Sequence, residues 1–137
     1  RIAVQASLTG HLVIATLHTN DAPSAVTRLT DMGVEPYLLS SSLLGVLGQR
    51  LVRKICLACQ GKGCVSCGHS GYLGRVGVFE MMRVNERIRQ LIHDGAAEAD
   101  VRDAAIDSSM LPMRTYGQSL VDDGITTHEE LLRVTKD

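Results

Sequence analysis

The chain has 137 residues, enough for one domain or a little more, and its 45% hydrophobic and 21% charged residues exclude a disordered chain. Its 14 basic and 15 acidic residues give no electrostatic case for binding nucleic acid or an anionic membrane surface. No apolar run approaches the roughly 20 residues of a membrane span, and residues 1–8 lack the regions of a signal peptide. The first residue is an arginine in mid-pattern, which indicates a piece of a longer chain.

The N-terminal part of the sequence predicts a buried strand. Residues 1–8 are expected to be the end of a helix or a lead-in loop. Residues 11–18, HLVIATLH, then form a continuous apolar run with β-branched residues, which is typical of a strand covered on both faces. His11 and His18 at its ends have two readings: incidental histidines of a core strand, or polar groups of a strand whose tip faces a phosphate.

Two helices are predicted next. Asp21 is a candidate N-cap and Pro23 suits a first turn, so we expect a helix that stops at Gly33. Its apolar face would hold Ala25, Val26, Leu29 and Met32. A second helix is expected over residues 36–51, because Pro36 can open it and its side chains are small or apolar nearly all round.

The rest of the chain changes from short strands to helices. A strand over 50–55 leads into the glycine- and cysteine-rich residues 56–71, which cannot form a regular element, and residues 75–82 resume a strand pattern. From Asn85, a candidate N-cap, we expect helices over 86–94, 97–109 and 112–123, with Gly95 and Gly124 at helix ends. Thr127 and Glu130 predict a capping box before a last helix.

All four cysteines lie in one short segment, as two C-x-x-C pairs: Cys56, Cys59, Cys64 and Cys67. Each pair can place two thiolates on one ion, and the glycines between and after them permit the turns that aim backbone amides at sulfur. The pattern favours a zinc site that is structural, because no ligand position is left open. Free thiols or a local disulfide are the alternatives, and His69 could replace one cysteine.

The sequence has a candidate anion contact at His18 but no P-loop motif. A neutral histidine at a strand end followed by Thr19, Asn20 and Asp21 is a good hydrogen-bond donor for an anion, and it is also an ordinary strand terminus. No G-x-x-x-x-G-K-[ST] motif occurs, and Lys62 in the glycine-rich loop has no following Ser or Thr. This chain alone therefore cannot cradle nucleotide phosphates as a P-loop does.

Four stretches, in order, make the sequence similar to one family. LTGHLVIATLHTNDA resembles the His box of the type II secretion and type IV pilus assembly ATPases, and LLGVLGQRLVRKIC resembles the segment that follows it. GCVSCGHSGYLGRVGVFEMM resembles their tetracysteine exit, and DDGITTHEELLRVT resembles their C-terminus. The resemblance covers essentially the whole chain.

This resemblance implies an α/β fold, namely the C-terminal portion of a RecA-like P-loop ATPase domain with a tetracysteine zinc knuckle and a C-terminal helical subdomain. The expected parts are residues 1–55 of the ATPase domain, the zinc loop 56–71, and residues 72–137 with a strand and helices. It also implies a cytoplasmic homo-hexamer, peripheral at the inner membrane, that uses ATP and Mg²⁺ and contacts platform components of the secretion or pilus system.

Site residues follow from the same resemblance. His18 would lie near the γ-phosphate, with His11 supporting it, and Thr19 and Arg75 are candidates for nucleotide contacts. Arg28 and Arg50, inside family motifs, would have structural or subunit-interface roles. The sequence departs from the family pattern in two ways. The Walker A, Asp box and Walker B segments are absent from it, and the linker between its C-x-x-C pairs is short. A zinc-stabilised helical adaptor without nucleotide chemistry is the alternative function.

Overall fold

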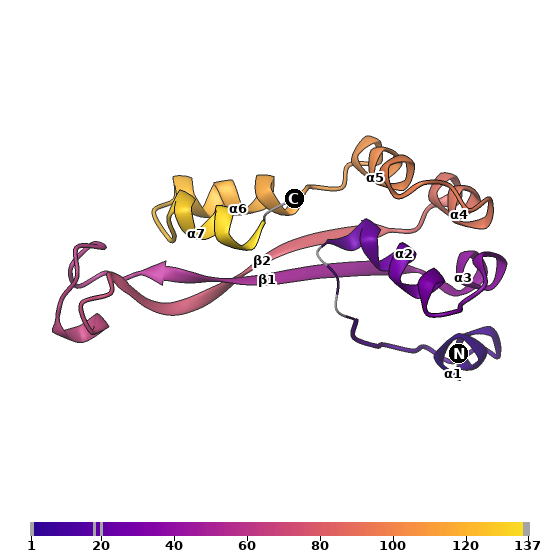
Figure 1. Cartoon of the computed structure of the whole chain (residues 1–137), viewed down its shortest axis with the longest axis horizontal. Coiled ribbons are helices and arrows are strands. Elements are labelled where there is room, and N and C mark those ends of the chain that lie inside the picture. Colours follow the sequence, from indigo (N-terminus) through magenta and orange to yellow (C-terminus); the bar gives the residue numbers. More distant parts are fainter. Residues whose placement is uncertain (1, 18, 20, 136–137) are drawn as a thin grey trace. The chain divides into compact units, whose positions relative to one another are not determined.

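The computed structural model describes residues 2–17, 19 and 21–135 (Figure 1). The chain divides into two compact units. The first consists of Arg1–Gly48 and Met81–Met110, and the second consists of Gln49–Glu80 and Leu111–Asp137. Among the described residues, no helix is long and apolar enough to cross a membrane.

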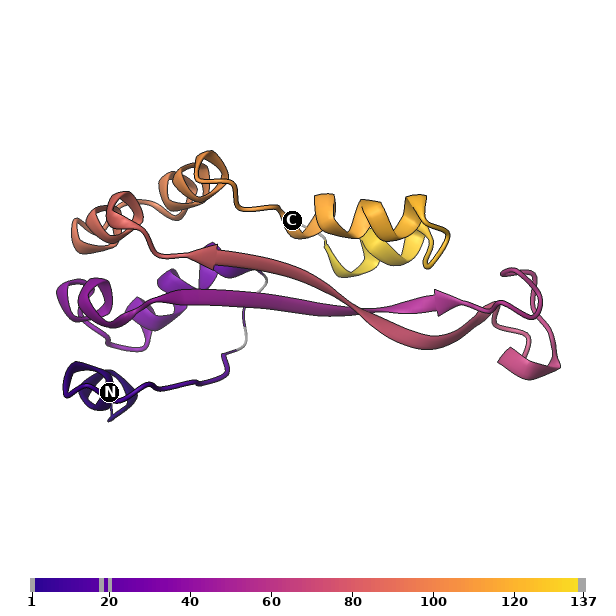
Figure 2. The ribbon, with the colours of Figure 1, turned by 180° about the vertical axis from the view of Figure 1, so that it is seen from behind.

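A long β-hairpin is the sheet of this chain. Strands β1 (Gly45–Ile55) and β2 (Tyr72–Arg83) form a two-stranded sheet. The strands are antiparallel, because Val84 N–H donates to Leu44 O at 3.0 Å and, at the opposite end of β1, Cys56 N–H donates to Gly71 O at 2.9 Å. Figures 1 and 2 show the two strands side by side from both directions. The cysteine-rich loop joins them.

The predicted helix over residues 36–51 is wrong beyond its first turns. Helix α3 spans Pro36–Ser42, and β1 begins at Gly45. A Cβ on Gly45 would lie 3.1 Å from Met81 Cε and 3.2 Å from the backbone oxygen of Met82. Glycine, which has no side chain, therefore permits the close approach of the two strands here. Long-range pairing with β2 outweighs the apolar surface that favoured a helix. The predicted strands over 50–55 and 75–82 exist and are longer than expected.

The predicted buried strand over 11–18 is also wrong for the part that the structure describes. Residues 11–17 have no regular secondary structure, and the side chains of 11–16 are exposed, with Leu12 at 80% and Ile14 at 89%. A strand needs neighbouring strands to accept its backbone hydrogen bonds. The two-stranded sheet of the described residues does not include this segment, and so no strand of that sheet covers the apolar run.

The first unit is mostly helical. Besides α3 it contains α1 (Ile2–Leu8), α2 (Ala22–Asp31), α4 (Glu86–His93) and α5 (Glu98–Asp107). Two predicted N-caps are confirmed: Ser24 N–H donates to the Asp21 carboxylate and Ile88 N–H donates to Asn85 Oδ1, both at 2.9 Å. The buried apolar core includes Ala22, Leu39, Met82, Ile88, Val101 and Ala104.

The predicted apolar face of the α2 helix is only partly right. Ala25 and Val26 are buried, whereas Met32 is 57% exposed. Gly33, with φ of 94°, ends this segment as predicted, because a left-handed residue here stops the helix. Gly95, with φ of 69°, does the same after α4.

The second unit packs two helices on part of the hairpin. Helices α6 (Met113–Asp122) and α7 (His128–Val134) lie side by side in Figures 1 and 2. Val52, Val78, Met113 and Leu131 form the buried core of this unit. Thr127 caps α7 by accepting the Glu130 N–H at 3.2 Å, as predicted, but the second half of the predicted capping box is absent, since the Glu130 carboxylate bonds elsewhere.

Candidate metal centre

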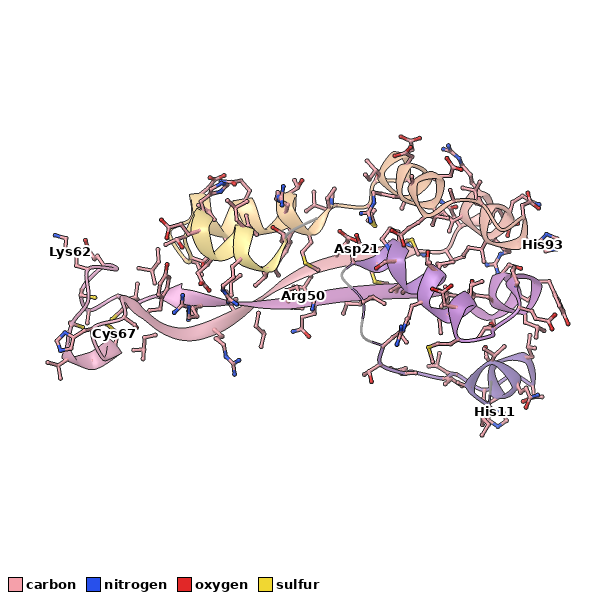
Figure 3. All side chains as sticks on the ribbon, in the orientation of Figure 1. His11, Asp21, Arg50, Lys62, Cys67 and His93 are labelled. Atoms are coloured by element: carbon pink, nitrogen blue, oxygen red, sulfur yellow. The ribbon has the colours of Figure 1, made fainter. Side chains whose placement is uncertain are left out.

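Both C-x-x-C pairs lie in the loop that connects β1 to β2. Cys56 directly follows β1, and Cys59 comes one turn later. Cys64 precedes a short 3₁₀ turn, η1 (Val65–Cys67), which ends with Cys67 as its last residue. Gly68 follows in the left-handed conformation, with φ of 61°. Figure 3 places Cys67 and Lys62 in this loop, at the end of the hairpin.

The four sulfurs form one cluster. Their Sγ atoms all lie within 4.8 Å of one another. The distances are 3.8 Å from Cys56 to Cys64, 3.9 Å from Cys59 to Cys67 and 3.7 Å from Cys64 to Cys67. Tetrahedral zinc with Zn–S bonds of about 2.3 Å requires sulfur separations of about 3.8 Å. The donor set and its spacing therefore fit one tetrahedral ion.

Backbone amides point at the sulfurs. Gly63 N–H donates to Cys59 Sγ at 3.1 Å, while Cys64 N–H and Gly71 N–H both donate to Cys67 Sγ at 3.2 Å. Burial raises the pKa of the Cys67 thiol, but the Cys64 and Gly71 amides outweigh it and lower the pKa to about 6. These donors stabilise thiolate, which is the form that binds metals.

The Cys56 thiol differs from that of Cys67, because its pKa is raised and not lowered. The Cys59 amide lowers the pKa of the Cys56 thiol, but burial and hydrogen bonds with the Cys59 and Cys64 thiols raise it to about 11. A divalent ion would remove this conflict, because it compensates the mutual repulsion of thiolates held less than 4 Å apart. The chemistry of the cluster thus agrees with its geometry in fitting a metal ion.

The base of the loop is held by the segment before α7. Ile55 N–H donates to Ile125 O at 2.8 Å, and the Thr126 hydroxyl donates to Arg53 O at 2.7 Å. The hydroxyls of Tyr72 and Thr127 lie 2.9 Å apart. These contacts tie both strands next to the metal loop to the C-terminal helices.

A buried carboxylate completes this base. Glu130, only 3% exposed, accepts hydrogen bonds from the Arg53 backbone amide at 2.8 Å and the Arg53 guanidinium at 2.7 Å, and Arg133 donates to it at 3.0 Å. The Arg53 guanidinium also lies 4.3 Å from the centre of the Tyr72 ring. Sequence reasoning missed this network, since it assigned Glu130 to a capping box. Arg53 within a strand pattern was the only signal of the network in the sequence.

The predicted nucleotide-site residues lie elsewhere. His11 is exposed, and its Nδ1 lies 3.1 Å from Thr9 Oγ1. The Thr19 hydroxyl donates to Asp21 O at 3.1 Å. Arg75 is exposed on β2, and His69 is exposed beside the cysteines without belonging to the metal group. His18 lies outside the described residues.

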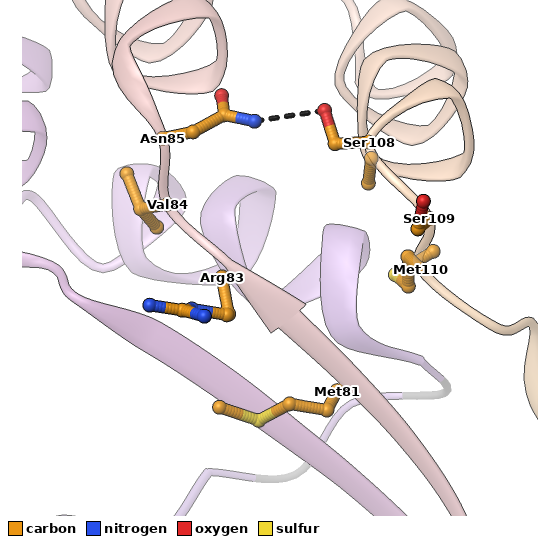
Figure 4. Close-up of a pocket in the computed structure, with 8 residues that line it drawn as sticks. Met81, Arg83, Val84, Asn85, Ser108, Ser109 and Met110 are labelled. Carbon is orange, nitrogen blue, oxygen red and sulfur yellow. Dashed lines mark hydrogen bonds between the residues drawn. The ribbon is translucent and has the colours of Figure 1, made fainter.

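The first unit contains a small pocket of about 330 Å³ (Figure 4). Asn85 lines it, but its amide nitrogen donates to Ser108 Oγ at 2.7 Å and its oxygen caps α4. The Ser108 hydroxyl in turn donates to Ala104 O at 2.8 Å. These polar groups are used by the fold, and so the pocket is a weaker candidate site than the cysteine cluster.

Solved structures define the class of protein. The crystal structure of the pilus retraction motor PilT with bound ADP is similar to 99% of this chain, at a TM-score of 0.74 and 28% identity, and this chain covers 36% of it. The structure of the ATPase DotB of Yersinia pseudotuberculosis is similar at a TM-score of 0.72 and 25% identity, and the match covers 96% of this chain and 32% of that chain. The predicted fold class is therefore confirmed: the chain has the α/β fold of the corresponding part of these ATPases.

The family follows from the sequence comparisons. A family model described as type II/IV secretion system protein matches residues 1–133, and the chain belongs to this family, as the resemblance predicted. Type II secretion system protein HxcR of Pseudomonas aeruginosa is 56% identical over all of the chain and 31% of its own length. Type II secretion system ATPase E of Vibrio cholerae is 45% identical, with 100% of the chain and 32% of that protein covered. The chain thus spans about a third of these relatives.

Proposed function

We propose that this chain is the C-terminal part of the motor domain of a cytoplasmic ATPase that powers assembly of a type II secretion pseudopilus or a type IV pilus. One observation carries the proposal: the family model matches residues 1–133, nearly the whole chain. The similarity to PilT, a pilus retraction motor whose structure contains ADP, supports it. So does the 39% identity with the type IV pilus assembly ATPase TfpB of Acinetobacter baylyi.

The hydrolytic site is shared with sequence outside this chain. The printed sequence has no P-loop, and so the backbone amides that cradle the β- and γ-phosphates must come from elsewhere in the protein. Within this chain, His18 would donate a hydrogen bond to a γ-phosphate oxygen and lose that partner on hydrolysis. His11 would support it, while Thr19 and Arg75 would contact nucleotide.

The cysteine cluster would hold one structural zinc ion. Cys56, Cys59, Cys64 and Cys67 would be its four ligands, which leaves no position for substrate or water. Zinc would supply cross-linking of the loop rather than chemistry. The loop is short, with three glycines among residues 60–68, and so a metal cross-link would add to the order that its backbone hydrogen bonds provide.

The working assembly is proposed from the resemblance. It is a homo-hexamer that binds ATP and Mg²⁺ and docks on inner-membrane platform components as a peripheral protein. The division of the chain into residues 1–55 of the ATPase domain, the zinc loop 56–71 and residues 72–137 is also part of this proposal.

The test uses the full-length protein and the variant His18→Ala. Removing a donor that stabilises transition-state charge costs on the order of 10²–10³ in turnover, and so ATP hydrolysis and secretion should fall by that factor. Folding, zinc content and much of the nucleotide affinity should be retained. His11→Ala should be milder, and His93→Ala, at an exposed position in α4, should be neutral.

Three measurements decide between the outcomes: turnover, nucleotide affinity and thermal unfolding. If His18→Ala keeps near wild-type turnover, or loses it only through unfolding, then His18 is a structural histidine. If the full-length protein shows no ATP turnover at all, the motor assignment fails and the zinc-stabilised adaptor is favoured.

A further inference from the structure

One glycine of the metal loop bonds to both C-x-x-C pairs. Gly71 N–H donates to Cys67 Sγ at 3.2 Å, and Gly71 O accepts the Cys56 N–H at 2.9 Å. Gly71 is buried, although it is not a ligand and lies outside both C-x-x-C motifs. Its peptide groups therefore link a ligand of the second pair to a ligand of the first.

The backbone approaches Gly71 so closely that a side chain does not fit. A Cβ there would lie 2.5 Å from Gly61 O and 3.1 Å from Gly61 C. Real Cβ atoms do not approach other atoms this closely, and a backbone carbonyl cannot rotate away as a flexible side chain can. Any side chain at position 71 must push Gly61, in the turn between Cys59 and Gly63, away from Gly71.

Other glycines of the hairpin separate this effect from backbone strain. Gly74 has φ of 82°, nearly the 83° of Gly71, so both backbones have a positive φ that disfavours a side chain. A Cβ on Gly74, however, would meet only Lys54 Cδ at an ordinary 3.7 Å. Gly63 is intermediate: its Cβ would lie 2.9 Å from His69 O, and its N–H donates to Cys59 Sγ at 3.1 Å.

We infer that Gly71, and less tightly Gly63, are positioning residues of the metal site, because each offers an N–H to a ligand sulfur at a point where the chain has no room for a Cβ. This inference rests on the proposed zinc site. Amide donors compensate the excess negative charge of four thiolates around a divalent ion, and they fix the directions of the sulfurs. Loss of such outer contacts typically weakens metal binding by about 10- to 100-fold.

The experiment compares Gly71→Ala with Gly74→Ala. Zinc affinity is measured by competition with a chromophoric chelator, and the absorption bands of bound Co²⁺ report the ligand geometry. Gly71→Ala should weaken zinc binding by about 10- to 100-fold and shift the Co²⁺ bands, whereas Gly74→Ala should stay within about 3-fold with unchanged bands. Gly63→Ala should fall between them.

Equal zinc affinity and equal Co²⁺ spectra for Gly71→Ala and Gly74→Ala would overturn the inference, since backbone strain alone would then explain both. If Gly71→Ala does not fold, Gly63→Ala is compared with Gly68→Ala, whose Cβ meets nothing within 4 Å, and equal affinities there overturn it. Failure of the wild-type chain to bind zinc is a different result, because it removes the proposed metal site itself.

Discussion

The buried Glu130 carboxylate bridges the backbone and the side chain of Arg53, with Oε2 2.8 Å from the Arg53 amide nitrogen and Oε1 2.7 Å from its guanidinium. Both residues belong to the second unit, and together they join α7 to β1. Replacing Glu130 would remove the acceptor of both of these hydrogen bonds.

The first prediction concerns this pair. Glu130→Ala should lower the free energy of unfolding by about 2–3 kcal/mol, because it removes hydrogen bonds to charged groups and leaves the Arg53 amide without its acceptor. The exposed neighbour Glu129→Ala should change it by less than about 0.5 kcal/mol. Urea unfolding of both variants checks this, and equal losses would contradict the assignment.

The same carboxylate predicts a pH dependence. Hydrogen bonds from Arg133 and Arg53 lower the pKa of Glu130 from 4.5 to about 2. A depressed folded pKa stabilises the fold above the unfolded pKa, and this contribution is lost as the pH falls from about 4.5 towards 2. The stability difference between wild type and Glu130→Gln should therefore shrink across that window. If the free energies of unfolding of the two proteins ran parallel across this pH range, the charge of Glu130 would not contribute to stability.

A third prediction concerns the packing of α6 on α7. A Cβ on Gly117 would lie 2.2 Å from Leu131 Cδ1, and Leu131 is fully buried. Gly117→Ala should therefore lower the free energy of unfolding by about 1–3 kcal/mol. This would outweigh the roughly 1 kcal/mol by which alanine stabilises a helix interior relative to glycine. Thr115→Ala, at an exposed position of α6, is the matched control. Thermal unfolding checks this, and Leu131→Val should recover part of the loss in the double variant.

The fourth prediction concerns zinc. Metal analysis of the purified protein should find about one ion per chain, and Cys59→Ser should lower that content and expose the loop amides to hydrogen exchange first. Helices α4 and α5, which have an apolar core in the first unit, should stay protected. Ser66→Ala, an exposed position between ligands, should keep its zinc. A stoichiometry near zero, with four freely reactive thiols in the native protein, would exclude the site.

The fifth prediction concerns the isolated 137 residues. They should neither hydrolyse ATP nor bind it tightly, since the sequence has no loop of backbone amides for the β- and γ-phosphates. Phosphate release and calorimetry measure both properties. Robust hydrolysis by this chain alone would mean that it contains a nucleotide site that the motifs do not reveal.

The sequence alone determined the features that depend on neighbours along the chain. Asp21 and Asn85 are read correctly as N-caps because a cap bonds within three residues. The cysteine spacing predicted a cluster because each C-x-x-C closes within one turn, and the family followed from four motifs in order. These inferences needed no knowledge of distant contacts.

Tertiary structure decided the features that depend on distant partners. Residues 45–51 have a helix-like apolar surface but pair with β2, and Glu130 fits a capping box but serves Arg53, which lies 77 positions away in the chain. Residues 11–16 belong to the pattern of a buried strand yet are exposed, because a strand is buried only when neighbouring strands and helices are present to cover it. The close approach of Gly61 to Gly71 likewise exists only once the two halves of the loop are folded together.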